Sequence, residues 1–513
     1  MPDYDAIMIG ANNHTMCAAA YLGKDLGYKC LILERRPFAG AAAMTREIVP
    51  GFKFHIAATG YATTLSPQVI KDLDLVKLGV EMIDLNPWLT GLFPDGKYVS
   101  VFGNLEDTYR EFAKFSKHDA DAFRAFWNKW KSLGELMGAA LDGPPAPFSA
   151  ISGAMEMGPE LQEMVRDMMF ISMKRSLDQT YENDYIKSTF YAWLEGMPYP
   201  PSGPGTLLAI VGHLILTIRW CVNKGGLGNV SKALAKAAEN YGATIKLNTE
   251  VKEILVKDGK AYGVKLTSGE KITASMVISG AEPQVTLLDM VGADHFDADF
   301  VRRVKNIWYE AAGVTMNWAL SGLPDFRIPR EKLKGFIGIS PSLEYCEKAY
   351  YERVIGEIPE KPMMIGYVLS EIDPTLAPPG KHVLTMYVYP MPYKLKKGNW
   401  DTRKEELYEK ALNTLAEYSP NLKQLVIGHG GFTPLELERE FHMTNGDHQH
   451  GSMEWGSLLG FRPIIGWNEP YRTPIANLFL CSAAMQLTGI SALVGLNVAK
   501  MIIEDAKKGK KGK

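Results

Sequence analysis

The sequence predicts a mixed fold that combines an α/β part with an α+β part. Residues Tyr4–Arg35 give an apolar run, a helix of small residues and a second apolar run, which is the strand–turn–helix–strand order of a βαβ unit. Two later apolar runs, Met276–Ser279 and Leu478–Cys481, indicate strands that return to the same sheet. Residues 300–430 alternate strand-like runs with a charged helix at Thr402–Tyr418, which favours a separate antiparallel sheet.

Length and composition are typical of a globular protein with more than one domain. The 513 residues exceed a single ordinary hydrophobic core and predict two or three domains. Hydrophobic residues make up 46% and charged residues 22%, which is the balance of a soluble protein. The formal net charge of −2 creates no overall attraction to nucleic acid, so we expect no nucleic-acid partner.

The cysteines and the N-terminal residues indicate the compartment. The five cysteines are scattered and lack the spacing of metal ligands, which favours buried free thiols in a reducing compartment. The first five residues lead directly into the first apolar run and leave no room for a signal peptide. We therefore expect a cytoplasmic protein.

The first βαβ unit has the features of a dinucleotide site, with an altered loop. Glu34 ends the second strand 24 residues after Gly10 (34 − 10), close to the spacing of about 20 at which an acid binds ribose hydroxyls. Asn12 and Thr15 replace the second and third glycines of G-x-G-x-x-G. Asn12 can adopt a positive φ more readily than most residues, and its amide could donate to a phosphate. We expect Thr15 to crowd the helix against the strand, with the helix N-terminus still available to an anion.

Two segments bear on contact with a membrane. Residues Thr206–Val222 are the most apolar stretch, interrupted by His213 and Arg219. Seventeen residues are marginal for a membrane span, so we expect a buried or interfacial helix rather than a membrane-inserted one. Residues 506–513 form a basic tail that we expect to be disordered and that favours peripheral contact with an anionic surface.

Separate blocks along the chain resemble one family. They are Glu34-Arg35-Arg36, Gly40, Gly225–Gly228, Thr249–Ile254, Ser279–Pro283, Gly446–Gly451, Phe461–Pro463, Tyr471–Pro474 and Leu478–Cys481. In this order they resemble the FAD-dependent phytoene-desaturase-like oxidoreductases of the amine-oxidase superfamily, in particular the branch of pyridine-nucleotide-disulfide-oxidoreductase-domain-2 proteins. The resemblance implies a Rossmann-like FAD-binding domain of residues 1–60, 220–285 and 460–505. It also implies an inserted substrate domain of residues 61–219 and 286–459, built on an antiparallel sheet and helices.

The resemblance implies a set of site residues. The residues expected to contact FAD are Gly10, Asn12, Thr15, Glu34, Arg35, Gly40, Ala41, Thr45, Val251, Gly280, Ser482, Ser491 and Asn497. His450 and His55 are the candidate catalytic residues, His213 and His448 are further polar candidates, and we expect no metal site. Arg35 and Arg36 either neutralise cofactor charge or form a solvated pair.

The chain also departs from the family's pattern. Ala41 stands where the family has the second glycine of a Gly-Gly pair, whereas Ser279-Gly280-Ala281-Glu282-Pro283 resembles the family's Ser-Asn-Ala-Asp-Pro strand end. After the last strand, Cys481-Ser482-Ala483-Ala484 replaces Cys-Gly-Ala-Gly. Glycines are therefore missing at each segment where backbone should contact the cofactor.

Two functions fit these features. The first is an FAD-dependent oxidoreductase that desaturates, saturates or isomerises a hydrophobic isoprenoid or alicyclic substrate by hydride transfer at flavin N5. Its electron acceptor would be a quinone, an electron-transfer protein or oxygen, and the chain would act alone, as a homo-oligomer or with a paralogous subunit. The second is a non-catalytic or weakly FAD-binding subunit that pairs with an active paralogue, which the missing glycines favour.

Overall fold

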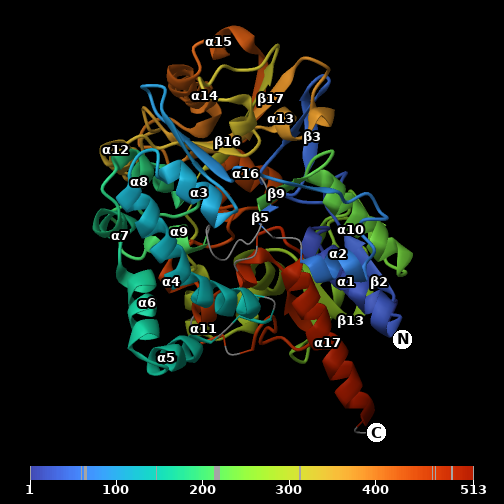
Figure 1. The fold of residues 1–513 in the computed structure, drawn as a ribbon. Coiled ribbons are helices and arrows are strands. Elements are labelled where there is room, and N and C mark those ends of the chain that lie inside the picture. Colours follow the sequence, from blue (N-terminus) through green and yellow to red (C-terminus); the bar gives the residue numbers. More distant parts are fainter. Residues whose placement is uncertain are drawn as a thin grey trace.

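Two seven-stranded sheets organise the chain. The structure, a computed structural model, describes residues 2–58, 61–62, 66–141, 143–145, 147–212, 220–310, 313–464, 466–467, 469–486 and 489–511. The first sheet and its helices lie near both chain ends, and the second sheet lies at the opposite end of the molecule (Figure 1). The mixed α/β and α+β architecture predicted from the sequence is confirmed.

The first sheet contains the predicted βαβ unit. Its strands are β1 (Tyr4–Ile9), β2 (Cys30–Leu33), β10 (Thr244–Lys246), β11 (Val251–Lys257), β12 (Lys260–Leu266), β13 (Lys271–Ser279) and β19 (Leu478–Leu480). The order is β10-β2-β1-β13, with β19 beside the end of β13 and the antiparallel strands β12 and β11 continuing from its start. Val277 of β13 pairs in parallel with both Ile7 and Leu478, which confirms that the two later apolar runs return to this sheet.

Both faces of the parallel strands of the first sheet are buried. Side chains alternate along a strand, so Met8 and Ile32 face one layer and Ile7 and Leu31 face the other. The first layer consists of α1 (Asn13–Leu26), α10 (Gly228–Asn240) and α17 (Leu493–Lys511). The second consists of β11, β12 and the π-helix η3 (Val285–Gly292). This double burial explains why the strands are continuous apolar runs in the sequence.

The second sheet is antiparallel except for one strand pair. Its strands are β7 (Leu89–Leu92), β8 (Tyr98–Val101), β14 (Val314–Leu320), β15 (Phe336–Ile339), β16 (Met363–Val368), β17 (His382–Tyr389) and β18 (Val426–Gly431). The order is β18-β14-β17-β16-β15-β7-β8, with β15 and β7 parallel. The predicted antiparallel sheet within residues 300–430 is confirmed, and the hairpin β7–β8 extends it.

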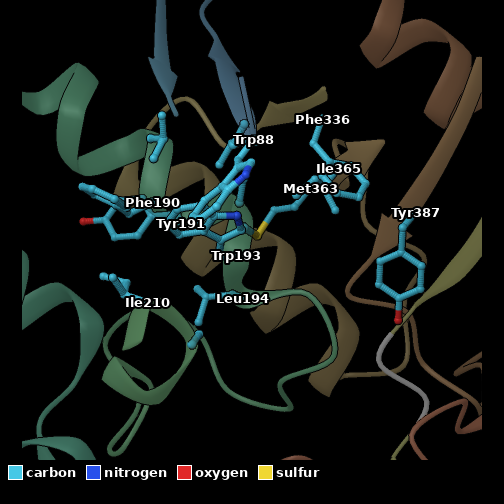
Figure 2. Close-up of a cluster of buried hydrophobic side chains, with 14 of the residues drawn as sticks. Trp88, Phe190, Tyr191, Trp193, Leu194, Ile210, Phe336, Met363, Ile365 and Tyr387 are labelled. Carbon is cyan, nitrogen blue, oxygen red and sulfur yellow. The ribbon is translucent and has the colours of Figure 1, made fainter. Parts of the chain in front are cut away.

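Helices cover both faces of the second sheet. On one face, α14 (Trp400–Tyr418) packs against Trp318 and Met386. On the other face, an aromatic cluster fills the space between the sheet and α8 (Asp184–Tyr191) and α9 (Leu207–Val211), and it includes Trp193, Phe336 and Tyr387 (Figure 2). Further helices are α2 (Pro67–Asp72), α3 (Leu105–Phe112), α4 (Lys117–Leu141), α5 (Phe148–Glu156), α6 (Pro159–Phe170), α7 (Met173–Thr180), α11 (Ala298–Lys305), α12 (Leu343–Val354), α13 (Leu369–Ile372), α15 (Leu422–Leu425) and α16 (Pro434–Phe441).

The expectation of one helix over residues 206–222 is wrong. The segment begins with the short helix α9 and ends in strand β9 (Trp220–Asn223), while residues 213–219, with His213 and Arg219, lie outside the described residues. β9 pairs with β5 (Tyr61–Ala62) and β6 (Met82–Asp84), so its backbone bonds to distant strands instead of to a helix. Among the described helices, none has the length and hydropathy needed to cross a membrane.

The basic tail is helical where it is described. α17 continues to Lys511, so the expectation of disorder is wrong for residues 506–511. The first turns of α17 are fixed by packing against α1, and each further residue then adds a helical hydrogen bond at little cost. The end of the helix projects away from the body of the molecule (Figure 1). The predicted contact with an anionic surface stays a prediction.

The contact between α1 and α17 depends on a glycine, which gives a first prediction. A Cβ at Gly495 would overlap the carbonyl oxygen of His14, and backbone cannot move aside as a flexible side chain can. We expect Gly495→Ala to lower the free energy of unfolding by about 2 kcal/mol, measured by urea denaturation. Gly153→Ala in α5 is the matched control, because a Cβ there meets no atom and alanine favours helix by about 1 kcal/mol. Equal effects of the two substitutions would contradict this account of the helix contact.

Candidate cofactor site

A cavity of about 550 Å³ lies at the carboxyl ends of the parallel strands of the first sheet. Glu34 follows β2, Gly10 follows β1, Gly280 follows β13 and Ser482 lies just after β19, and all four line the cavity. Ligands of open α/β sheets bind at this edge, in cavities of roughly 300–1,000 Å³. The position and size of the cavity therefore suit a cofactor.

The structure brings most of the predicted site residues together. Those that line the cavity are Gly10, Asn12, Glu34, Arg35, Gly40, Ala41, Val251, Gly280, Ser482 and the candidate catalytic His450. The wall also contains residues that the sequence did not single out for this site, among them Asn13, His14, Glu282 and Phe441. The remaining predicted residues, Thr15, Thr45, Ser491, Asn497 and His55, are not part of this wall as the described residues form it.

Asn12 caps helix α1 instead of replacing a glycine. Its φ of −89° is extended, so Asn12 does not use the left-handed conformation that asparagine tolerates. The side-chain oxygen accepts a hydrogen bond from the Thr15 N–H at 3.0 Å, and Nδ2 donates to the Gly280 carbonyl oxygen at 3.0 Å. Such a cap satisfies an N–H that the helix leaves unpaired. Thr15 does not crowd the strand, because its hydroxyl donates to the Gly10 carbonyl oxygen at 2.6 Å.

Gly280 is required by the side chains opposite it. A Cβ at this position would overlap Asn12 Nδ2 and approach Thr15 Cγ2 to 2.7 Å. The family pattern has glycine at position 12 and asparagine at position 280, and this chain has the reverse. The two departures are therefore one exchange, in which the carboxamide comes from the helix side of the contact instead of the strand side.

Glu34 is held ready to accept hydrogen bonds. It is buried, Oε2 accepts from the Ala11 N–H at 2.9 Å, and Oε1 pairs with Arg36 Nε at 3.1 Å. The guanidinium carbon of Arg36 lies 4.9 Å from the ring centroid of Phe38 and 4.9 Å from that of Phe441. Each carboxylate oxygen accepts more than one hydrogen bond, so Glu34 retains capacity for ribose hydroxyls.

Arg35 contacts the C-terminal end of helix α16, which belongs to the part of the chain that forms the second sheet. Its Nη2 donates to the carbonyl oxygens of Glu440 at 2.7 Å and Arg439 at 3.3 Å, at the C-terminus of α16. Burial lowers the pKa of Arg35, opposed in part by nearby acids. Arg36 is mostly buried and paired with Glu34, so it is not part of the solvated pair that was one of the two sequence interpretations.

Three residues of the cavity wall each have a buried polar atom without a partner in the described part of the chain, and their chemistry fits a polar ligand. Arg36 Nη1, His14 Nδ1 and Ser482 Oγ have no hydrogen-bonding partner among the described residues. An unpaired buried polar group costs about 1–3 kcal/mol, so such groups are rare without a function. A donor, an acceptor and a hydroxyl in one cavity match the phosphate, hydroxyl and carbonyl groups of FAD.

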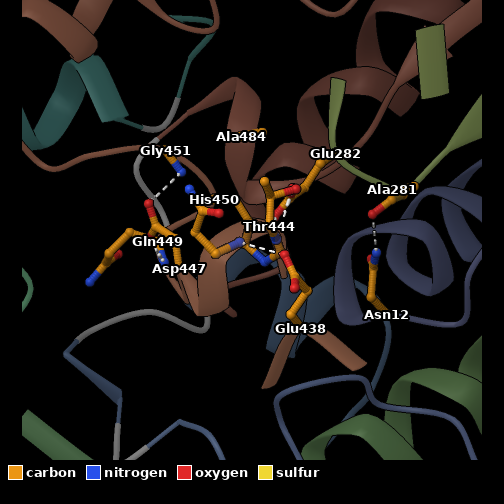
Figure 3. Close-up of polar contacts among 12 residues, drawn as sticks. Asn12, Ala281, Glu282, Glu438, Thr444, Asp447, Gln449, His450, Gly451 and Ala484 are labelled. Carbon is orange, nitrogen blue, oxygen red and sulfur yellow. Dashed lines mark hydrogen bonds and ion pairs between the residues drawn. The ribbon is translucent and has the colours of Figure 1, made fainter. Parts of the chain in front are cut away.

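Glu282 holds His450 at the cavity wall. The buried Glu282 carboxylate lies 2.9 Å from His450 Nδ1 and also accepts from the Thr444 hydroxyl (Figure 3). Asp447 shapes the same loop by accepting from the Gln449 N–H at 2.8 Å, and burial raises the pKa of Asp447 to about 6. Arg462 donates to the carbonyl oxygen of Gln449 at 2.5 Å and fixes the loop from behind.

The predicted residues outside the wall hold cofactor segments together. His55 Nδ1 lies 2.9 Å from the Tyr367 hydroxyl and Nε2 accepts from the Leu227 N–H at 3.4 Å, so it joins the second sheet to α10. The Thr45 hydroxyl oxygen accepts from the Gly228 N–H at 3.0 Å. Ser491 Oγ accepts from the Leu493 N–H at 3.2 Å and caps α17. Asn497 donates to the Gly143 carbonyl oxygen at 2.9 Å, which ties α17 to the loop after α4.

Comparison with known proteins assigns the class. A model of flavin-containing amine oxidoreductases matches residues 16–314, more than half of the chain, and the chain belongs to this family. A crystal structure of an oxidoreductase from Methanosarcina mazei has the same fold, with a TM-score of 0.62 at 16% identity over 97% of this chain and 100% of the other. The protein is an FAD-dependent oxidoreductase, as the fold and cavity indicate.

Relatives confirm the branch predicted from the sequence. The mouse pyridine nucleotide-disulfide oxidoreductase domain-containing protein 2 is 30% identical, over 99% of this chain and 94% of its own length. A limonene dehydrogenase subunit of Castellaniella defragrans is 24% identical, over 98% of this chain and 94% of its own length. Phytoene desaturases and prolycopene isomerases are also among the relatives.

The backbone at Ala41 leads to a second prediction. Ala41 has a φ of 48°, a left-handed conformation that favours glycine, at a position where the family has glycine. We expect Ala41→Gly to raise the free energy of unfolding by about 1 kcal/mol, measured by urea denaturation. Ala235→Gly in the middle of α10 is the matched control and should lower it by about 1 kcal/mol. A loss of stability in both variants would show that Ala41 is unstrained.

The loop at the cavity wall gives a pH prediction. Burial lowers the pKa of His448 from 6.5 to about 4, with the charge of His450 as the second cause. Between these pH values the unfolded chain binds a proton at His448 that the folded chain does not, so the free energy of unfolding falls as the pH falls. We expect the wild type to lose about 3 kcal/mol more than His448→Gln across this window, measured by urea denaturation.

Other groups titrate in both proteins and cancel in the comparison. His14, whose pKa burial also lowers to about 4, and Asp447 are present in each. Parallel stability curves for the wild type and His448→Gln across the acid range would show that His448 is protonated in the folded protein.

Proposed function

We propose that this FAD-dependent oxidoreductase desaturates, saturates or isomerises a hydrophobic isoprenoid or alicyclic substrate. When bound, FAD supplies a hydride acceptor or donor at N5 for a carbon of the substrate. Limonene, phytoene and prolycopene, the compounds in the names of relatives, are hydrocarbons with carbon–carbon double bonds, and they support this substrate class. The electron acceptor would be a quinone, an electron-transfer protein or oxygen.

The observation that carries this proposal is that one short segment, His448–His450, contacts both the cofactor cavity and the aromatic cluster. His450 lines the cavity, and two residues earlier the ring of His448 lies 5.1 Å from that of Tyr387 in the aromatic cluster. Burial raises the pKa of Tyr387 well above its usual range and lowers that of His448, so both side chains are neutral. An uncharged aromatic region next to the cofactor cavity suits a hydrocarbon.

The proposal gives each part of the site a role. Glu34 would bind the ribose, the N-terminus of α1 the pyrophosphate, and Val251 would lie beside the adenine. His450, positioned by Glu282, would hold or release a proton at the substrate end of the cavity, since a carboxylate partner fixes an imidazole's orientation. Gly40, Gly280 and Ser482 would contact the cofactor.

We propose the domain division on the same basis. Residues 1–60, 220–285 and 460–505 contain every strand of the first sheet, and residues 61–219 and 286–459 contain every strand of the second. The hairpin β3 (Thr45–Val49) and β4 (Phe52–His55) belongs to the first set but packs on the second sheet, where Asn317 donates to the His55 carbonyl oxygen at 3.0 Å.

A second candidate function is a weakly FAD-binding subunit that acts with a paralogue. Ala41 and Ala492 hold left-handed backbone conformations in two cofactor segments, and such strain makes these segments less stable in the conformation that forms the site. The Castellaniella defragrans relative is named as one subunit of its enzyme, which supports an assembly of more than one chain.

Flavin content tests the proposed function. We expect the purified chain to be yellow with close to one FAD per chain, and anaerobic addition of an unsaturated isoprenoid or monocyclic hydrocarbon to change the visible flavin absorbance. A saturated hydrocarbon of the same size, offered to the oxidised enzyme in parallel, separates reaction from binding. Colourless protein that FAD cannot reconstitute would overturn the proposal, and obligate co-purification with a flavin-containing partner would favour the second candidate.

A further inference from the structure

The first turn of α1 contacts the other segments of the cofactor site through three consecutive side chains. Asn12 bonds to the carbonyl oxygen of Gly280, as described above. Asn13 Nδ2 donates to the Ile490 carbonyl oxygen at 2.9 Å, and His14 Nε2 lies 2.8 Å from the Gly489 carbonyl oxygen. Side chains therefore connect the altered phosphate loop to β13 and to the turn before α17.

His14 carries an acceptor that this arrangement leaves unused. A carbonyl oxygen only accepts hydrogen bonds, so Nε2 bears the proton and Nδ1 is an acceptor. His14 is 4% exposed, and burial lowers its pKa to about 4, so the ring is neutral at physiological pH. Nδ1 has no partner among the described residues, although the side chain lines the cavity.

The order of the strands locates His14 along the cavity. Glu34 after β2, Gly10 after β1, Gly280 after β13 and Ser482 after β19 follow one another across the sheet. An acid after the second strand binds the adenosine ribose, and the helix after the first strand binds the pyrophosphate. The ribityl chain and the ring must then extend toward β13 and β19.

The position of the His14 ring along the cavity corresponds to the position expected for the ribityl chain. Its backbone belongs to the first turn of α1, where the pyrophosphate would bind, and its ring extends to Gly489, which lies before α17 and lines the cavity. In FAD, the group between the pyrophosphate and the ring is the ribityl chain, which carries hydroxyl donors. The adenine amino group would lie on the β2 side, and the ring N3–H lies beyond the ribityl chain.

We propose that His14 Nδ1 accepts a hydrogen bond from a ribityl hydroxyl of FAD and so positions the flavin in this glycine-poor site. The inference rests on FAD binding in this cavity, as proposed above. It assigns to a side chain a contact with the cofactor that neither the motif spacing nor the family pattern indicates. It also accounts for a buried acceptor that would otherwise be left unsatisfied.

Two substitutions test the roles of the two ring nitrogens of His14 separately. Glutamine at this position places its amide where Nε2 lies, so His14→Gln keeps the contact to Gly489 and removes the acceptor at the Nδ1 position. Asparagine places its amide near Nδ1, so His14→Asn supplies an oxygen acceptor there and loses the contact to Gly489. His118→Gln, at an exposed histidine of α4, is the control.

The measurement is the dissociation constant of each protein for FAD and for three analogues in which one ribityl hydroxyl is replaced by hydrogen, followed by flavin fluorescence. For each protein, the dissociation constant for an analogue is divided by that for FAD. This ratio reports the contact of the missing hydroxyl and is insensitive to general weakening of the fold. For one analogue we expect a ratio of about ten in the wild type, His14→Asn and His118→Gln, and about one in His14→Gln.

The outcomes distinguish this inference from the cofactor assignment. A wild-type chain that binds no FAD overturns both. A wild-type chain that binds FAD but shows a ratio of one for all three analogues overturns the inference alone. So does a ratio in His14→Gln equal to that of the wild type, or a ratio of one in His14→Asn.

Discussion

The hydrogen bond from Asn12 to the Gly280 carbonyl oxygen is the contact on which the cofactor site depends. It joins the start of α1 to the end of β13, two points 268 residues apart in the sequence. The same carboxamide caps α1, so the position of the helix and the position of the strand end are set together. Gly280 has no side chain because Asn12 and Thr15 occupy that space.

The fold could be predicted because its signals are local. The βαβ unit and the returning strands are apolar runs of the length of buried strands. The helix that joins β1 to β2 is the crossover that a parallel strand pair requires. β9 could not be predicted in this way. Three apolar residues at the end of a longer apolar stretch have no period that separates strand from helix, and the partners β5 and β6 are far away in the chain.

The cofactor residues at strand ends could be predicted for the same reason, since topology alone brings Gly10, Glu34, Gly280 and Ser482 to one edge. His14 and Glu282 could not, because their roles depend on where side chains point. For the contact between Asn12 and Gly280 a signal did exist in the sequence. Asparagine at position 12 and glycine at position 280 each depart from the family pattern, and considered together they form a single exchange.

The contact between Arg35 and the end of α16 has a consequence for how the cofactor enters and leaves. The cavity wall includes the end of α16 and the residues just after it, namely Phe441, His442 and Met443. The part of the chain that forms the second sheet therefore covers a site that is built on the first sheet. The two hydrogen bonds from Arg35 hold that cover in place. We therefore expect FAD exchange to follow the rate at which the cover opens, so that retention of the flavin is a kinetic property as well as one of affinity.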